Sequence, residues 1–492
     1  MTTTAKANNN NNNNSNNNNN SRKVAIIGGG IAGLSCAQRL SMSHPNQNPG
    51  GGGAYDVTVY DTGRLRPGGR CSSRRAGDAP KSNENNDEEF PLLSQYSFDH
   101  AAQLISLPTT TATATSDNND DNHDKNKNDR FRDFQQQLQT WLDQGIVKEF
   151  PKNSVCTITN NGVEPILGGS RFFHGIDGMG GLPMAMKQQI CDDASSFSFS
   201  LEQDVWVSPS SGVKYQKESG KWKLQANGKI LGYYDTLLLA HNGKCADRIM
   251  SKTPAKDLHK LLRVNFAPTV ASHGGHKMTL NSLYSWTICV PTTTKNKSTL
   301  SQALPDSFVS GFVQNHPHLR MITCQTRKYN YNDDDDEDDN NNNQHEVWTI
   351  LSSAKFAKKH KAPQEFLPKE TIDRVTELLG EAVQESLGLK EDLKILDQRL
   401  QLWGAAVPLN VWENGCGYIY DDKYNVGVCG DWLVEPSIAG AWTSGKLLAD
   451  RLLEDLSDEQ KTSKSSSTGL EGSFERSESA MKLGIASLVD TQ

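Results

Sequence analysis

The chain has 492 residues, which is enough for two or three domains. Its net charge is −7, and a single run of seven acidic residues, 333–339, accounts for that charge, so the remainder is about neutral. The sequence has no basic stripe of the kind that binds nucleic acid, so we expect no nucleic-acid partner.

The hydrophobic content of 35% is low because some tracts can bury nothing. Residues 8–20 are twelve Asn and one Ser, and the acidic run continues into more Asn. We expect disorder in residues 1–21, in insertions near 109–129 and 329–344, and in a flexible tail at 456–492.

The nine cysteines include no C-x-x-C pair, so we predict neither a disulfide framework nor a metal site. No stretch reaches the ~18 apolar residues of a transmembrane helix, and the amino terminus has no apolar signal core. We therefore expect an intracellular, cytoplasmic protein. The Thr-containing, acid-free start leaves a plastid or mitochondrial address open.

The first half of the chain begins with a βαβ pattern. Residues 24–27 predict a buried strand, 31–42 a helix, and 55–61 a β-rich strand that ends in an acid. Further along, 96–107 contains a short β-like piece. The periodicity then predicts helices at 130–145 and 180–193, followed by strands at 203–207, 221–226 and 233–240.

The second half is mixed. Segments 306–315 and 346–357 look like strands on either side of the acidic insertion. Residues 369–388 predict a helix with its charges outside. A strand is then expected over 424–433, ending at Gly430-Asp431, and a helix over 439–453.

A G-x-G-x-x-G pattern follows the first strand at Gly28, Gly30 and Gly33. The first glycine permits a tight turn, the second a close approach to a pyrophosphate, and the third close packing of helix on strand. The helix amides then face the anion. Asp61 ends the next strand, where an acid can hold ribose hydroxyls. The pattern predicts a dinucleotide site, with a purely structural glycine turn as the alternative.

A second glycine turn, "RPGGR", follows that strand with Gly69 and Arg70. Arg70 would bring a fork of donors to a diphosphate. A simple nicotinamide-binding domain has no need of such a turn, so the pair of turns favours a flavin dinucleotide. The alternative is a basic surface loop.

At the other end of the chain, Asp431 can accept a hydrogen bond from a ribityl hydroxyl. Small residues near the start of the next helix, among them Ala441, would let its amino-terminal end approach a flavin ring. The positive end of that helix would stabilise negative charge that grows on the ring during reduction.

These segments resemble the flavin-containing amine oxidase superfamily, most closely its renalase-like branch. The resemblance is carried by "VAIIGGGIAGLSCAQRL", "VTVYDTGRLRPGGRCSSRR", "FDHAAQ", "RFFHGIDGMGGLPMAM" and "YNVGVCGDWLVEPSIAGAWTSGKLLADRLL", in that order. It implies an α/β Rossmann-type FAD-binding domain with a mixed-sheet α+β substrate domain. The implied FAD-binding domain is discontinuous, 22–80, 175–250 and 395–455, and the substrate domain takes 81–174 and 251–394.

The resemblance also implies the residues at the cofactor. Val205 would offer its backbone to the adenine, and no context for covalent flavin attachment is found, so we expect non-covalent FAD. The chain departs from the family at 240–243, "AHNG", and at Ala101 and Leu104, near the expected ring face. The full set of predicted cofactor-binding residues is Gly28, Gly30, Ile31, Ala32, Gly33, Asp61, Gly69, Arg70, Val205, Gly430, Asp431 and Ala441.

The chemistry of such a site needs a substrate held against the ring and a way to lose a proton. His100, His174 and His241 lie in or beside the matching segments and could accept a proton, although each is also a candidate structural residue. Aromatic residues suit a flat or cationic substrate. The candidates are Trp286, Trp403, Trp432 and Trp442, most of which we expect in the core.

The sequence therefore predicts an FAD-dependent oxidoreductase. The resemblance implies an oxidase that transfers hydride from an amine or a dihydronicotinamide-like small molecule to flavin N5, with O2 as acceptor. Two alternatives stay open: an FAD-dependent desaturase or isomerase acting on a lipid-like substrate, and a non-catalytic flavin-binding scaffold.

Overall fold

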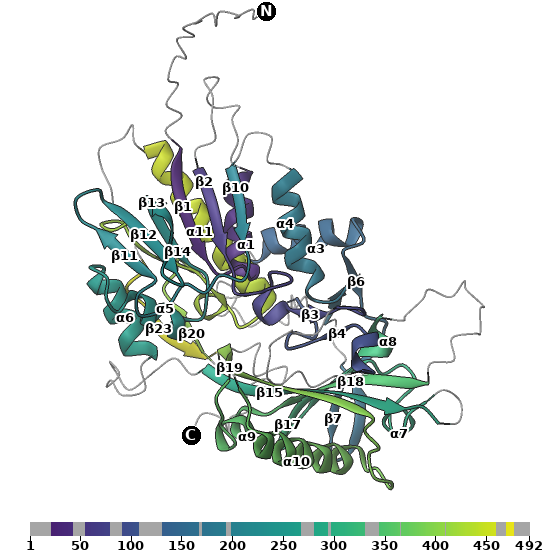
Figure 1. Ribbon diagram of the computed structural model, residues 1–492. Coiled ribbons are helices and arrows are strands. Elements are labelled where there is room, and N and C mark those ends of the chain that lie inside the picture. Colours follow the sequence, from purple (N-terminus) through teal and green to yellow (C-terminus); the bar gives the residue numbers. More distant parts are fainter. Residues whose placement is uncertain are drawn as a thin grey trace, which may run out of the picture.

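A computed structural model describes residues 21–42, 55–78, 91–107, 130–166, 170–192, 198–266, 280–293, 297–329, 344–364, 366–408, 410–458 and 469–476. Two large sheets dominate this part of the chain (Figure 1). The predicted disordered segments 1–20, 109–129, 330–343, 459–468 and 477–492 lie outside the described residues.

The first sheet has six strands in the order β10-β2-β1-β14-β22-β21. The first five run parallel, and only β21 is antiparallel to its neighbour. The strands are β1 (Arg22–Ile27), β2 (Tyr55–Tyr60), β10 (Ser198–Glu202), β14 (Thr236–Leu239), β21 (Ile419–Asp421) and β22 (Val426–Val428). This is a doubly wound arrangement assembled from distant segments of the chain.

Both faces of this sheet are covered, which explains the buried apolar runs of β1, β14 and β22, whereas β2 and β10 alternate apolar and polar residues. One face carries α1 (Ile31–Ser41), α3 (Arg132–Asp143), α4 (Gly181–Asp192) and α11 (Ile438–Asp458) over one apolar core. The other face carries β11 (Val213–Gln216), β12 (Lys221–Ala226), β13 (Lys229–Tyr234), α5 (Gly243–Met250) and α6 (Lys256–Phe266) over a second core.

The second sheet has seven strands in the order β19-β15-β18-β17-β16-β7-β8. They are β7 (Val155–Thr159), β8 (Gly162–Pro165), β15 (Leu280–Pro291), β16 (Ser310–Val313), β17 (Leu319–Cys324), β18 (His345–Ser352) and β19 (Asp397–Pro408). All its pairs are antiparallel except β16 with β7.

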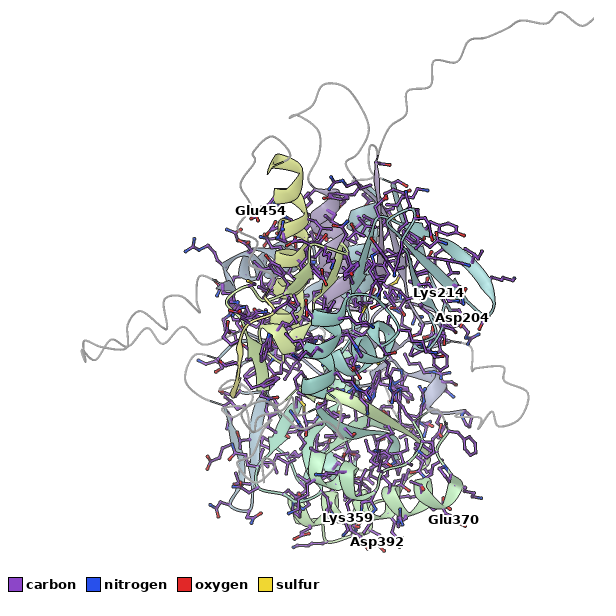
Figure 2. The ribbon with its side chains drawn as sticks, turned by 90° about the vertical axis from the view of Figure 1, so that its left-hand side faces the viewer. Asp204, Lys214, Lys359, Glu370, Asp392 and Glu454 are labelled. Atoms are coloured by element: carbon purple, nitrogen blue, oxygen red, sulfur yellow. The ribbon has the colours of Figure 1, made fainter. Side chains whose placement is uncertain are left out.

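Helices α9 (Ala354–Lys359) and α10 (Lys369–Leu387) lie beneath this sheet, on the side away from the first sheet (Figure 1). The apolar stripe of α10 packs on it through residues such as Val375 and Leu379. The charges of α10 point outward as predicted, and Figure 2 shows Lys359, Glu370 and Asp392 at that outer surface. The opposite face of the sheet is therefore the one that meets the dinucleotide-binding side.

The remaining elements are short. They are η1 (Gly69–Cys71), β3 (Ser73–Arg74), η2 (Leu93–Gln95), β4 (Phe98–Asp99), β5 (Ile105–Ser106), β6 (Val147–Glu149), β9 (Phe172–Gly175), α7 (Thr299–Gln302), α8 (Gln325–Tyr329), β20 (Asn410–Glu413), η5 (Asp431–Leu433) and β23 (Ser473–Arg476). Strand β3 pairs with β4, and β9 pairs with both β5 and β6.

The predicted helices occur within two residues of their expected starts, but several strand predictions need correction. The strand expected at 203–207 lies instead at 198–202, as β10. The expected strand at 346–357 stops at Ser352, where Ser353 caps α9 by accepting from the Phe356 amide. The expected strand at 424–433 breaks after Val428, and the turn η5 follows.

The structure adds three observations near the predicted boundaries. Strand β19 belongs to the seven-stranded sheet, although 395–455 was assigned to the FAD-binding part, because it pairs with β15 from one end to the other. Tyr329 closes α8 rather than starting an insertion. Within the expected flexible tail, Ser473–Arg476 forms β23, which pairs with β20.

Candidate cofactor and substrate site

The glycine turn lies at the carboxyl end of β1, and its packing requires glycine. A Cβ on Gly33 would lie 1.9 Å from the Gly28 carbonyl oxygen, so only glycine lets α1 sit this close to the strand. Gly28 has φ +117° and lies against the Ala240 carbonyl. At Gly30 the nearest atom to a Cβ is 3.8 Å away, which leaves that backbone approachable.

Two helices point their amino termini toward this edge. No side chain caps the first turn of α1, where Gly30 is the N-cap and Ile31 and Ala32 follow. Helix α11 packs beside α1 in a similar direction, since Ala32 meets Gly445 and Arg39 pairs with Asp450 further along. The uncapped first turn of α1 and two positive helix ends at one edge form a favourable environment for a diphosphate.

The carboxyl ends of the other parallel strands supply the remaining predicted groups. Asp61 ends β2 and is 7% exposed. Burial raises the pKa of Asp61, and hydrogen bonds from the Gly63 and Gly29 amides oppose that rise. The Val205 amide donates to the Asp61 carbonyl over 2.9 Å, which leaves only the Val205 carbonyl for an adenine contact.

Arg70 and Asp431 are 361 residues apart in sequence and in direct contact in space. Arg70 Nη1 and Nη2 donate to the two Asp431 carboxylate oxygens over 2.6 and 2.8 Å, and Nη1 also donates to the Ala406 carbonyl over 2.5 Å. Burial alone would lower the pKa of Arg70, but the charge and hydrogen bonds of Asp431 outweigh it and raise that pKa.

This pair joins the early glycine turns to the late segment and to the second sheet. A guanidinium has five N–H donors, and the three bonds above leave two of them for a phosphate. The Arg70 side chain is 34% exposed, whereas that of Asp431 is only 5% exposed. Next to them, the Gly430 amide donates to Ser444 Oγ of α11, which fixes the turn that carries Asp431.

Ala441 lies inside the first turn of α11, with its amide bonded to the Ser437 carbonyl. Its small side chain is partly exposed, and the preceding Gly440 amide donates to Ser437 Oγ over 3.0 Å. Gly69 has φ +54°, and a Cβ added there would meet no atom within 4 Å, so this glycine serves the turn rather than a tight contact.

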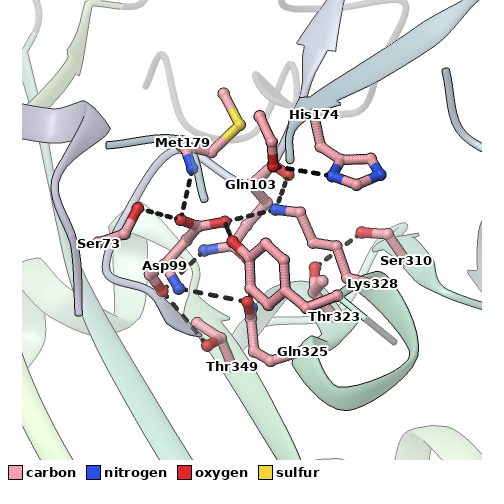
Figure 3. A network of polar contacts seen from close by, with 12 residues as sticks. Ser73, Asp99, Gln103, His174, Met179, Ser310, Thr323, Gln325, Lys328 and Thr349 are labelled. Carbon is pink, nitrogen blue, oxygen red and sulfur yellow. Dashed lines mark hydrogen bonds and ion pairs between the residues drawn. The ribbon is translucent and has the colours of Figure 1, made fainter. Parts of the chain in front are cut away.

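The segment "FDHAAQL" lies beside Arg70, since the Ala102 amide donates to the Arg70 carbonyl over 3.0 Å. Beneath it is a buried polar network that the sequence did not reveal (Figure 3). Lys328 and Asp99 form an ion pair with both side chains 0% exposed, with Nζ 2.5 Å from Oδ2. Lys328 Nζ also donates to the Gln103 carbonyl, and the Tyr329 hydroxyl donates to Asp99.

The other carboxylate oxygen of Asp99 is also satisfied. This Oδ1 accepts from the Met179 amide over 2.9 Å and from Ser73 Oγ. Burial lowers the pKa of Lys328, and Asp99 opposes that shift. Burial likewise raises the pKa of Tyr329 well above its usual value. The network locks β3, β4, α8 and the start of α4 together at the edge of the site.

Of the histidine candidates, His174 lies closest to this network. It is 4% exposed, its Nδ1 is 3.0 Å from the Gly175 carbonyl, and its ring contacts those of Phe150 and Tyr329. Burial, together with Lys328, lowers the pKa of His174 to about 4. It is therefore a neutral imidazole at physiological pH.

The other two histidines are placed differently. His100 packs its ring edge-on against Phe98, and its amide donates to the Ser72 carbonyl. His241 follows β14 near Gly430, and burial lowers its pKa to about 4. Its Nδ1 is a buried atom with no hydrogen-bond partner among the described residues.

The tryptophan candidates separate by face. Trp286, Trp432 and Trp442 belong to three apolar cores, as expected for most of them. Trp403 instead lies on the upper face of the second sheet with Leu283 and Leu104. It is the tryptophan that the structure brings to the junction of the two sheets.

Within the described ranges, no cluster of three or more His, Cys, Asp or Glu could hold a metal ion, and no helix is both long and apolar enough to cross a membrane. None of the nine cysteines forms a disulfide, and Cys429 is buried.

Comparison with known proteins supports the architecture. A family model described as an NAD(P)-binding Rossmann-like domain matches residues 26–114. No curated protein sequence matches the chain. A structure of a single-site mutant of putrescine oxidase is similar with a TM-score of 0.51 at 12% identity, covering 88% of this chain and 99% of that one.

Two other structures are similar at lower scores. Cyclohexylamine oxidase from Brevibacterium oxydans IH-35A has a TM-score of 0.45 at 10% identity, covering 89% of this chain and 100% of the other. A fatty acid isomerase from P. acnes has a TM-score of 0.47 at 12% identity, covering 87% and 98%. The family-model match and the putrescine oxidase mutant at a TM-score of 0.51 confirm the predicted Rossmann-type domain and two-domain fold, while the renalase-like branch stays a prediction.

Proposed function

We propose that this chain binds FAD non-covalently and is an oxidoreductase. The observation that carries the proposal is the contact of Arg70 with Asp431 at the carboxyl edge of the Rossmann-type sheet. It brings a candidate diphosphate-binding arginine and a candidate ribityl-binding carboxylate together, near the amino termini of α1 and α11.

The residues present fit this cofactor. The backbone at Gly30 has room for a phosphate, and Arg70 has donors left for it. Asp61 would bind ribose hydroxyls, the Val205 carbonyl would meet the adenine, and Gly430-Asp431 would flank the ribityl chain. The start of α11 near Ala441 would lie against the ring. Cys429 is the cysteine nearest in sequence to the Gly430-Asp431 turn. It is 0% exposed and packed in the core, so it is not accessible for covalent attachment of a flavin, which favours non-covalent binding.

FAD bound in this way supplies a two-electron acceptor for a substrate hydride. The protein would contribute the rest. The Asp99–Lys328 network fixes the segment that carries Gln103 and Leu104, and Trp403 gives an aromatic surface across from it. His174, a neutral imidazole next to Lys328, is the residue we propose for accepting a hydrogen bond from the substrate. We further propose O2 as the electron acceptor and a small molecule as the substrate.

The first experiment is to purify the protein and record its visible spectrum before and after acid precipitation. The proposal predicts flavin absorbance that moves to the supernatant as free FAD. Flavin that stays with the precipitate would contradict non-covalent binding. A colourless protein that takes up no added FAD would contradict the proposal as a whole.

The second experiment tests the oxidoreductase assignment. Under anaerobic conditions, a panel of amines and dihydronicotinamides is added, and bleaching of the flavin band identifies the substrate class. Admission of O2 should then restore the band and produce hydrogen peroxide. Restoration only by an artificial acceptor would assign a dehydrogenase instead.

A further inference from the structure

The upper face of strand β19 presents a row of polar side chains without partners in the described part of the chain. Alternate residues of a strand share a face, so Arg399, Gln401 and Trp403 point the same way. The residues between them, Leu400 and Leu402, pack on the core toward α10. On the face of Arg399 and Gln401, Trp403 contacts the apolar cluster that includes Leu283.

Each member of this row lacks a polar partner among the described residues. Gln401 Oε1 and Trp403 Nε1 are buried atoms with no hydrogen bond. Arg399 has neither a hydrogen bond nor an ion pair there, and burial, with a contribution from Arg74, lowers its pKa to about 10. Two buried polar atoms without a partner on one face are uncommon, because buried polar groups are normally paired. Arg399 continues the same face as a half-exposed cation.

The nearby carboxylates are already engaged. Asp397, two residues before Arg399 and on the same face, accepts from the Leu92 and Leu93 amides. Asp78, whose backbone carbonyl accepts from Arg74, has its carboxylate held by both terminal nitrogens of Arg66. Amide hydrogen bonds leave the negative charge of Asp397 in place, so Arg74 and Arg399 outnumber it by one cation, and the region between β3 and β19 has a small excess of positive charge.

The row continues directly into the site described above. Register places Arg399 opposite Thr287, which is opposite Thr349 on the next strand. Thr349 Oγ1 donates to the Asp99 carbonyl over 3.3 Å. At the other end of β19, the Ala406 carbonyl accepts from Arg70. The strand thus links the proposed diphosphate position, the Asp99–Lys328 network and the unpaired arginine.

We infer that Arg399, Gln401 and Trp403 form the substrate-recognition surface, and that the substrate carries an oxyanion, a carboxylate or a phosphate, at the Arg399 end. This inference rests on the proposed function, because it assigns the substrate of that site. An uncompensated cation beside a second arginine attracts an anion and repels an ammonium group. Arg399 and Trp403 are about 13 Å apart along the strand, so the substrate is elongated.

The assignment separates two of the substrate classes considered from the sequence. A simple cationic amine would meet Arg399 and Arg74 unfavourably. A lipid-like chain without a polar head would leave Gln401 and Trp403 unsatisfied, which costs free energy. A molecule whose oxidisable end lies near Trp403 and whose anionic end lies at Arg399 satisfies all three residues of the row.

The test uses three ligands that share one aromatic ring: benzoate, phenyl phosphate and benzylamine. Isothermal titration calorimetry measures each Kd on the full-length protein. We expect benzoate or phenyl phosphate to bind at least about tenfold more tightly than benzylamine. The stronger of the two anions distinguishes a carboxylate from a phosphate substrate. Benzylamine binding as tightly as both anions would overturn the inference.

The variant Arg399→Gln should weaken binding of the preferred anion by about tenfold to a hundredfold. The control Arg248→Gln removes the same charge from an exposed position on α5 and should leave Kd unchanged. Arg399→Lys, which keeps the charge but not the fork, should lie between wild type and Arg399→Gln. Unchanged anion binding in Arg399→Gln would overturn the inference.

A stability measurement separates recognition from a structural role. Because Arg399 has no partner to lose, Arg399→Gln should unfold at the same or a higher temperature than wild type. A clear fall in melting temperature would instead show that the arginine supports the fold, and would overturn the inference. The visible spectrum of the protein is recorded in a separate experiment. A colourless protein that still binds anions through Arg399 would refute the proposed FAD cofactor but would leave the anion site standing.

Discussion

Replacement of Lys328 by methionine tests whether the buried network is as important to the structure as its geometry indicates. Lys328 and Asp99 are both fully buried, and the lysine is the only cation that Asp99 contacts among the described residues. Lys328→Met would leave the Asp99 carboxylate with neutral donors only, from Ser73, Met179 and Tyr329. It would also remove a donor from the Gln103 carbonyl.

Breaking a buried ion pair from one side costs about 3–5 kcal/mol. We expect Lys328→Met to lower the free energy of unfolding by about that amount, measured by urea denaturation followed by tryptophan fluorescence. The double variant Asp99→Asn with Lys328→Met should recover part of the loss, because no unpaired charge then remains.

Lys446→Met is the matched control. Lys446 contacts the carboxylates of Asp133 and Asp450 over 2.8 and 2.7 Å, but its side chain is 22% exposed and Asp133 is 50% exposed. Such a pair contributes about 1 kcal/mol or less. If the two methionine variants lose similar stability, or if Lys328→Met loses less than about 1 kcal/mol, the account of the network is wrong.

Three further predictions concern the cofactor edge and the buried histidine. Gly33→Ala should prevent retention of FAD, because its Cβ would lie 1.9 Å from the Gly28 oxygen. The control Gly380→Ala in α10, whose Cβ would lie 3.7 Å from the Trp286 ring of β15, should retain the cofactor, and equal FAD content in both variants would contradict the turn geometry. Arg70→Ala should weaken FAD binding by about tenfold or more in a fluorescence titration. Arg70→Lys should restore little of this affinity, because lysine lacks the forked donors of a guanidinium. Wild-type affinity in either variant would show that Arg70 does not bind the cofactor. The pKa of His174 is about 4 in the folded protein, below the ordinary 6.5, so the unfolded chain binds the proton first as pH decreases. The free energy of unfolding should therefore fall between pH 6.5 and 4, by about 3 kcal/mol for this group. His174→Phe should flatten this part of the stability–pH curve, and an unchanged slope would show that another group causes it.

The sequence predicted the parts of the fold that are encoded locally. The turn at Gly28–Gly33 is flanked by an apolar run and an amphipathic helix, so strand, turn and helix could each be identified. The long helices α10 and α11 have strong periodicity over many residues. Arg70 and Asp431 were each assigned to the cofactor from their own turns, and the structure brings the two side chains into contact.

The remaining features depend on pairing between distant segments, which no local pattern encodes. Strand β19 pairs with β15 across more than 100 residues, so its place in the second sheet could not be read from its own composition. Lys328 and Tyr329 lie in a polar stretch that reads as a loop before the acidic run. A fully buried lysine is rare and becomes recognisable only when Asp99 is found beside it.

The site residues divide in the same way. The glycines and Asp61 follow from their spacing, because their roles depend on strand ends. The sequence does not identify Arg399 as a site residue by itself. Its face of β19 becomes known only when Trp403 is found on one face of the strand and Leu402 on the other. A search of that strand for polar residues in phase with Trp403 would have found it.

The central claim is that an early and a late segment of the chain bind one flavin dinucleotide between them. The most direct measurement is a crystal structure of the purified protein grown with FAD. The account predicts density for the diphosphate between Gly30 and Arg70, with the ribityl chain passing Asp431 and the ring at the start of α11. Density at another place, or an Arg70–Asp431 pair that excludes the cofactor while FAD is bound elsewhere, would contradict it.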